Sequence, residues 1–118
     1  VGHHRLDYLK HDCGSIVTRC VKTTHRHRHG VDGSYWATLG YDDVQDGLRQ
    51  TFPNLLLENC SGGGPIKDCG VIQRTHYAVT TDTLSHLPNQ QSIYDSTFAF
   101  PPLILQAYTI GHATRAPA

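Results

Sequence analysis

The segment Leu55-Leu-Leu-Glu-Asn-Cys60, followed by Ser61-Gly-Gly-Gly64, sets the fold class of this 118-residue chain. Its short and nearly continuous apolar run is typical of parallel strands that are covered on both faces. The glycine cluster ends the run, because glycines interrupt strands and form turns. The sequence therefore predicts a buried strand whose carboxyl end opens into a glycine-rich loop.

Further strands and helices are predicted on both sides of this segment. β-prone residues predict a short strand from Arg5 to Asp12, which runs into a turn at Gly14. Apolar residues at three- to five-residue intervals predict an amphipathic helix from Tyr35 to Phe52, and Pro53 blocks its continuation. Downstream, the sequence predicts a strand from His76 to Thr80, a short helix within Leu84 to Tyr94 that contains Pro88, a strand around Thr97 to Phe100, and an apolar run from Pro101 to Ala107.

Strands that alternate with helices or long connections predict an α/β fold with a parallel sheet. A closed (β/α)8 TIM barrel places its strand ends in one ring, whereas a doubly wound sheet has a single switch point. Asp12 and Asp82 each follow a predicted strand and fit such a ring. We therefore expect residues 1–118 to form part of one catalytic TIM-barrel domain. A full barrel takes about 250 residues, so we expect this domain to be incomplete at both ends and inactive alone.

Composition limits the classes of partner. The formal net charge is zero, which predicts a neutral partner and excludes strong attraction to nucleic acid. No apolar run approaches the roughly 20 residues that span a bilayer, so no membrane association is expected. The segment Val1 to Lys10 has neither an initiating Met nor an apolar signal region, and we expect the natural start to be missing. The irregularly spaced cysteines leave the compartment open, with the cytoplasm slightly favoured over secretion: Cys13, Cys20, Cys60 and Cys69.

Asp12 and Asp82 are the candidate catalytic residues. Cleavage of a glycosidic bond uses two carboxyl groups on opposite sides of the anomeric carbon. One is ionised to attack or to activate water, and the other is protonated to donate to the leaving oxygen. An isolated Asp after a strand is more often a turn former or a helix cap. The motifs around the two aspartates therefore decide the interpretation.

These motifs resemble those of a known enzyme family. Asp7-Tyr-Leu-Lys-His-Asp12 resembles the nucleophile motif of clan D glycoside hydrolases. Leu56-Leu-Glu-Asn-Cys-Ser-Gly-Gly-Gly64, with Asp68 and Gly70 after it, resembles the Glu-x-Cys-Ser-Gly-Gly-Gly signature of family 36 α-galactosidases. Later matches, in the family's order, are Thr81-Asp82 for the acid/base segment, Phe98-Ala-Phe-Pro101 for the segment that begins the next barrel strand, and Gly111-His112 for a Ser-His pair. The resemblance extends from about Leu6 to His112.

The resemblance implies barrel strands four to seven and a retaining hydrolase that cleaves terminal α-galactosides by double displacement. It implies that Asp12 is the nucleophile and that Asp82 is the general acid that later acts as base. It also implies no metal and no cofactor. In the family's pattern the residues that contact the galactose are Lys10, Cys60 and the backbone of Gly62 and Gly63. The retaining mechanism predicts a separation of roughly 5–5.5 Å between the carboxyl groups.

Departures from the family pattern leave the exact sugar open. Pro65-Ile66-Lys67 stands where the family commonly has Gly-Arg-Phe, and His11 replaces the most common Trp. The expected partner is an α-galactoside oligosaccharide or glycoconjugate. One alternative is a related α-glycosidase of the α-N-acetylgalactosaminidase type, and another is a non-catalytic carbohydrate-binding relative. A homo-oligomer of the full-length protein also stays open.

Histidines alternate with arginines between His25 and His29, within a polar segment, residues 23–34, that we expect to be a long loop. Alternate residues of an extended chain share a face, so the imidazoles could converge on a metal. The interleaved arginines and the lack of a matching cysteine or acidic cluster argue against a defined site. A solvated loop is therefore the default expectation, and a His-rich metal-binding protein is the weaker alternative.

Overall fold

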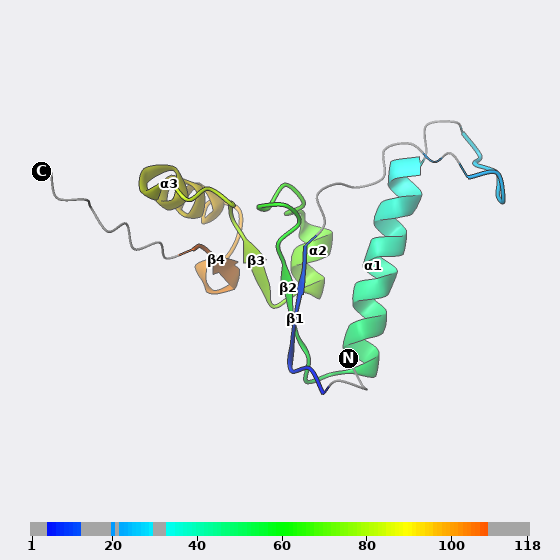
Figure 1. The fold of residues 1–118 in the computed structure, drawn as a ribbon, viewed down its shortest axis with the longest axis horizontal. Helices are drawn as coiled ribbons and strands as arrows, with labels where there is room; N and C mark the ends of the chain where they lie inside the picture. The colour runs from blue at the N-terminus through cyan, green and yellow to red at the C-terminus, as the bar shows by residue number, and fades with distance from the viewer. Residues whose placement is uncertain (1–4, 13–19, 21, 30–32, 109–118) are drawn as a thin grey trace, which may run out of the picture.

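The computed structural model describes residues 5–12, 20, 22–29 and 33–108 (Figure 1). Within these ranges, strands and helices alternate along the chain. The elements are β1 (Tyr8–His11), α1 (Gly33–Thr51), β2 (Leu56–Asn59), α2 (Cys69–Arg74), β3 (Tyr77–Val79), α3 (His86–Ser96), the 3-10 helix η1 (Pro102–Ile104) and β4 (Leu105–Gln106). None of the helices in these ranges combines the length and the apolar character that crossing a bilayer requires.

The strands form one parallel sheet in the order β1-β2-β3-β4. Each strand therefore pairs with the next strand of the chain, with a helix in each connection (Figure 1). A doubly wound sheet would reverse this order at a switch point, whereas a barrel continues it around a ring. The fold is thus α/β with a parallel sheet, consistent with part of a TIM barrel.

The two faces of the sheet differ. His11 pairs with Asn59 in the register of β1 and β2, and both contact α1. The His11 ring stacks on Tyr41 at 4.9 Å, and Tyr41 Oη donates to Asn59 Oδ1 at 3.1 Å. Lys10 pairs with Glu58 in the same register, and successive side chains of a strand point to opposite faces. Lys10 and Glu58 therefore lie on the face turned away from α1.

The core lies between the sheet and its helices. Burying a side chain such as Leu or Val stabilises a protein by about 1.5–3 kcal/mol relative to leaving it exposed. The continuous apolar run predicted as a buried strand supplies Leu55 and Leu57, which are both buried. The other buried apolar residues of the described ranges are Cys60, Ile66, Val71, Ala78, Val79 and Leu105.

Two proline positions explain the helix boundaries. The amphipathic helix predicted from Tyr35 to Phe52 is confirmed as α1. It begins two residues earlier than predicted and ends at Thr51, two residues before Pro53. Pro88 lies in the first turn of α3, where its missing N–H removes no helical hydrogen bond. Proline therefore blocks the extension of one helix and is accommodated at the start of another.

The predicted strand around Thr97 to Phe100 is wrong. The N–H groups of these residues donate back to carbonyl groups of residues 93–96, so the segment forms turns that continue from the end of α3. The strand lies further on, at β4, inside the predicted apolar run from Pro101 to Ala107. Aromatic residues suggested a strand there, but the local hydrogen bonds of the helix end take precedence.

Candidate functional site

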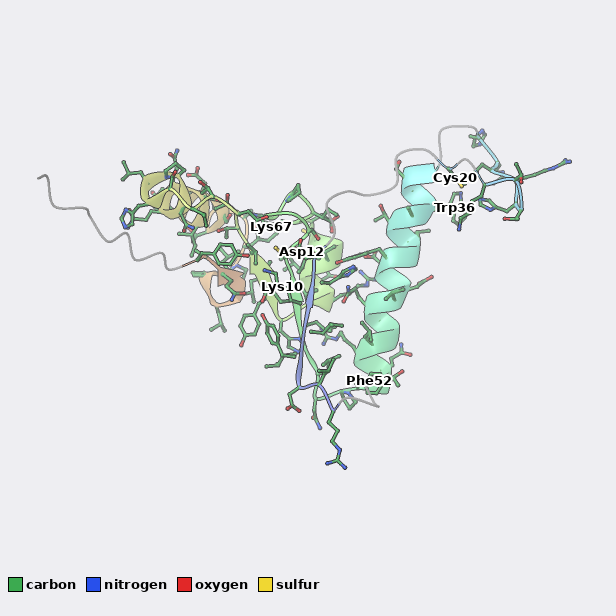
Figure 2. The ribbon with its side chains drawn as sticks, viewed as in Figure 1. Lys10, Asp12, Cys20, Trp36, Phe52 and Lys67 are labelled. Carbon is green, nitrogen blue, oxygen red and sulfur yellow. The ribbon has the colours of Figure 1, made fainter. Side chains whose placement is uncertain are left out.

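The site residues come from the carboxyl ends of neighbouring strands. Asp12 directly follows β1, Cys60 directly follows β2, and Asp82 lies three residues after β3. Because the strands are parallel, these positions share one edge of the sheet. Figure 2 shows Lys10, Asp12 and Lys67 near this edge. The topology thus brings together side chains that are far apart in the sequence.

Asp12 is exposed, and its carboxylate is held by a hydrogen bond from the glycine segment, residues 62–64. Its Oδ1 accepts a hydrogen bond from the main-chain N–H of Gly62 at 2.9 Å. This bond stabilises the carboxylate and holds the pKa of Asp12 below its ordinary value of 3.8, with smaller contributions from Cys60 and Lys10. Asp12 is therefore ionised at neutral pH, which is the state that a nucleophile or a base requires.

Asp82 also contacts the glycine segment, at Gly63. Its Oδ1 accepts from Cys60 Sγ at 3.7 Å and from Tyr108 Oη at 3.4 Å. A Cβ placed on Gly63 would come within 2.9 Å of both Cβ and Cγ of Asp82. Cys60 also helps to lower the pKa of Asp12. The two aspartates therefore share Cys60 and the adjacent glycines as a common support.

The glycine segment needs its glycines for steric reasons. Gly62, Gly63 and Gly64 have φ values of 62°, 83° and 90°, in the left-handed region that L side chains rarely adopt. A Cβ on Gly64 would collide with the carbonyl oxygen of Val79. The backbone of this segment therefore packs directly on the end of β3 and on the residues that follow it, and the close approach depends on the missing side chains.

Lys10, which lies within β1, contacts the same cluster of site residues through Tyr108. Its Nζ donates to Tyr108 Oη at 2.8 Å and lies 5.3 Å from the centre of the same ring. The hydrogen bond to Tyr108 raises the pKa of Lys10, so the ammonium is charged at neutral pH. Nζ also lies 3.6 Å from Glu58 Oε1. Glu58 is only 4% exposed, and this burial raises the pKa of its carboxyl group.

Tyr108 and Glu58 are site residues that the sequence analysis missed. Tyr108 follows β4, and its hydroxyl accepts from Lys10 while it donates to Asp82. The hydrogen bond from Lys10 lowers the pKa of Tyr108, but burial and the nearby Cys60 outweigh it and the net pKa is raised. The phenol thus keeps the proton that it donates. For Glu58 the available signal was its place as the first residue of the Glu-x-Cys-Ser-Gly-Gly-Gly motif. For Tyr108 the only signal was its position after an apolar run.

The structure brings all six sequence-predicted site residues together. They are Lys10, Asp12, Cys60, Gly62, Gly63 and Asp82. The main-chain N–H of Gly62, a residue whose backbone is expected to contact the sugar, donates to Asp12 in the structure. The predicted pair Gly111-His112 lies outside the described residues.

The fold and this site define a class: an α/β protein with a parallel sheet, consistent with part of a TIM barrel, and with two carboxyl groups at its strand ends. A family model described as Melibiase matches residues 1–115. The chain belongs to the Melibiase family, which confirms the resemblance found in the sequence. No solved structure matches the chain significantly.

Known α-galactosidases are similar to this chain. The alpha-galactosidase of Escherichia coli is 30% identical over 112 residues, which are 95% of this chain and 15% of that protein. Alpha-galactosidase 2 of Pediococcus pentosaceus is 29% identical over 118 residues, which are 99% of this chain and 16% of that protein. The bifunctional alpha-galactosidase/sucrose kinase AgaSK of Mediterraneibacter gnavus is 31% identical over 104 residues, or 88% of this chain and 10% of that protein. The chain thus spans 10% to 16% of these relatives.

Proposed function

We propose that the full-length protein is a retaining glycoside hydrolase that removes terminal α-galactosides by double displacement. The observation that carries this proposal is the shared support of Asp12 and Asp82 on Cys60 and the glycine segment. The names of the similar proteins, all alpha-galactosidases, indicate the substrate class. Two carboxyl groups held on one support match the requirement of glycosidic bond cleavage.

In the first step, Asp12 attacks the anomeric carbon while Asp82 gives its proton to the leaving oxygen. The bond to the aglycone breaks as the ester to Asp12 forms. In the second step, Asp82 takes a proton from water, whose oxygen attacks the anomeric carbon and releases Asp12 as a carboxylate. Two inversions retain the configuration. The hydrogen bond from Gly62 supports the anionic form of Asp12 at the start and the end of this cycle.

Lys10, Cys60, Gly62 and Gly63 are the proposed substrate-binding residues. The charged ammonium of Lys10 is a strong donor for sugar hydroxyl groups. Gly62 is exposed, so a sugar can approach its main chain without a Cβ in the way. Gly63 would offer its main chain to the sugar in the same way, and its missing side chain also leaves room for Asp82. Binding and catalysis would thus depend on one continuous segment after β2.

We further propose that β1 to β4 are strands four to seven of the barrel. Tyr8, Leu56 and Tyr77 lie on the sheet face turned away from α1 and are 41%, 40% and 37% exposed. In a closed barrel, side chains from the other strands cover this face. Residues 1–118 alone would therefore be inactive, so activity is to be measured on the full-length protein that carries them.

The test of the nucleophile is turnover of a nitrophenyl α-galactoside. Asp12→Asn should lower kcat by at least about 1,000-fold, because the amide cannot form the ester intermediate. The matched control is Asp7→Asn, an exposed aspartate at the opposite end of the same strand, which should leave turnover unchanged. Equal turnover by Asp12→Asn would refute the nucleophile assignment.

The stereochemistry of the first product tests double displacement. NMR should show the α-anomer as the first product, and a β-anomer would refute double displacement.

The leaving group separates the role of Asp82 from that of Asp12. Asp82→Asn should lose far more activity on an α-galactosyl disaccharide than on the nitrophenyl glycoside, because nitrophenolate leaves without protonation. Asp95→Asn, an exposed aspartate in α3, is the matched control. An equal loss on both substrates would contradict a role as general acid.

A further inference from the structure

A second cluster of reactive side chains lies in the connection between β1 and α1. His25 Nε2 lies 3.0 Å from His27 Nε2 and 3.4 Å from Cys20 Sγ. Ligand atoms of all three residues lie within 4.8 Å of one another. Among the described residues, Cys20, His25 and His27 thus form a group of three potential metal ligands. Figure 2 shows Cys20 beyond the end of α1 that carries Trp36.

Two of the three distances between these ligand atoms are close to those around a tetrahedral zinc ion. Zn–N bonds of about 2.05 Å and Zn–S bonds of about 2.3 Å place two nitrogens about 3.3 Å apart and a sulfur and a nitrogen about 3.6 Å apart. The observed 3.0 Å and 3.4 Å are within a few tenths of these values. Because the ligand atoms of all three residues lie within 4.8 Å of one another, a small adjustment of the side chains would let one ion contact all three.

The ligand types select a particular metal chemistry. Thiolate and imidazole together favour Zn²⁺ and similar transition metals over Mg²⁺, which prefers oxygen ligands. Cys20 forms no disulfide. Its thiolate would offset part of the repulsion from the basic residues of the same segment: Lys22, Arg26 and Arg28. The cysteine that the sequence argument lacked is thus supplied by the fold.

We propose that Cys20, His25 and His27 form a binding site for a divalent transition metal of the zinc type. Three protein ligands leave a fourth tetrahedral position for water or another ligand. The bound ion would join residue 20 to residues 25 and 27. This site is separate from the carboxylate site, and its test does not depend on the proposed hydrolase activity.

The experiment is a metal titration of the full-length protein after its metals have been stripped with a chelator. Zn²⁺ is titrated in competition with a coloured chelator, and Co²⁺ is used as the spectroscopic probe. We expect one equivalent of Zn²⁺ per chain to bind at Cys20, His25 and His27. Bound Co²⁺ should give a charge-transfer band from the thiolate and the intense visible bands that are typical of tetrahedral coordination. Mg²⁺ should not compete.

Variants identify the ligands. Loss of an outer-shell partner already lowers metal affinity about 10- to 100-fold, so Cys20→Ser and His27→Gln should lower it by at least that factor. The matched controls are Cys69→Ser, an exposed free thiol, and His86→Gln, an exposed imidazole, which should bind as the unsubstituted protein does. The absence of a charge-transfer band in the unsubstituted protein would overturn the proposal. Equal affinity in Cys20→Ser would also overturn it, because histidines alone would then explain the binding.

Discussion

Gly63 lies directly against Asp82: a Cβ on Gly63 would stand 2.7 Å from the main-chain nitrogen of Asp82 and 2.9 Å from its Cγ. Contacts this short do not occur between real side chains, so either residue would have to move. The proposed acid/base residue is thus positioned by the absence of a side chain on the preceding strand's loop. Stability and activity should therefore both respond to a change at this glycine.

Gly63→Ala should lower the free energy of unfolding by at least about 1–2 kcal/mol, because the left-handed conformation is unfavourable for a residue with a Cβ. Displacement of Asp82 should also lower kcat/KM on an α-galactosyl disaccharide. The control is Gly47→Ala in α1, where a Cβ has open space and the gain in helix propensity is about 0.5–1 kcal/mol. Thermal unfolding and steady-state kinetics measure the two effects. Normal activity in Gly63→Ala would contradict this support of Asp82.

Tyr108→Phe removes the hydroxyl that accepts from Lys10 and donates to Asp82. A hydrogen bond to a charged group contributes about 1.5–3 kcal/mol, which corresponds to a roughly 10- to 100-fold loss in kcat/KM. If Tyr108 positions the acid, the loss should be larger for a disaccharide than for a nitrophenyl glycoside. The control is Tyr35→Phe in α1, whose residue is 60% exposed and whose ring contact with Trp36 is kept. A loss that is independent of the leaving group would assign Tyr108 to sugar binding instead.

The sequence predicted the parts of the fold that depend on local pattern. The apolar run from Leu55 onward and the spacing of apolar residues along α1 are local signals, and both elements are where they were expected. Helix α2 was missed because its six residues, Cys69–Arg74, are too few for a periodic pattern. Its start was marked only by Asp68, whose side chain accepts from the Val71 N–H at 2.9 Å.

The site could be predicted only where a motif marks it. The two aspartates and the glycine segment stand in recognisable motifs, whereas Tyr108 depends on how β4 pairs with β3, which no local pattern determines. The same holds for Cys20, whose approach to the histidines of the following segment depends on the path of the loop. Contacts between distant segments are thus the part that required the structure.

Asn59 should be essential for the stability of the glycine segment. Its buried side chain donates from Nδ2 to the carbonyl oxygen of Ile66 at 2.7 Å, and its Oδ1 accepts from Tyr41 and Ser61. Asn59→Ala leaves buried groups unpaired, which should cost about 1–3 kcal/mol of unfolding free energy. Asn54→Ala, an exposed position just before β2, is the control and should have little effect. Equal melting temperatures for the two variants would rule out this role.

His76 should make stability depend on pH. It forms two hydrogen bonds with Leu57 of β2. The main-chain N–H of Leu57 donates to Nδ1 of the His76 ring at 3.0 Å, and the main-chain N–H of His76 donates to the Leu57 carbonyl oxygen at 2.8 Å. Nδ1 can accept only when it carries no proton. Burial, and to a smaller extent the charge of Arg49, lowers the pKa of His76 from its ordinary 6.5. The neutral form is therefore the one that the folded state prefers.

The sign of the pH effect follows from this direction. Above pH 6.5 neither the folded nor the unfolded chain protonates this imidazole, and its contribution to stability is fully present. As the pH falls below 6.5, the unfolded chain takes up a proton while the folded chain resists it, so stability decreases until the lower folded pKa is reached. His76→Asn keeps an acceptor near the Nδ1 position but cannot titrate, so its melting temperature should fall less over this range. His86→Gln, at the exposed start of α3, should keep the full decrease. If His76→Asn and the unsubstituted protein lose stability with the same pH dependence, His76 is not the titrating group.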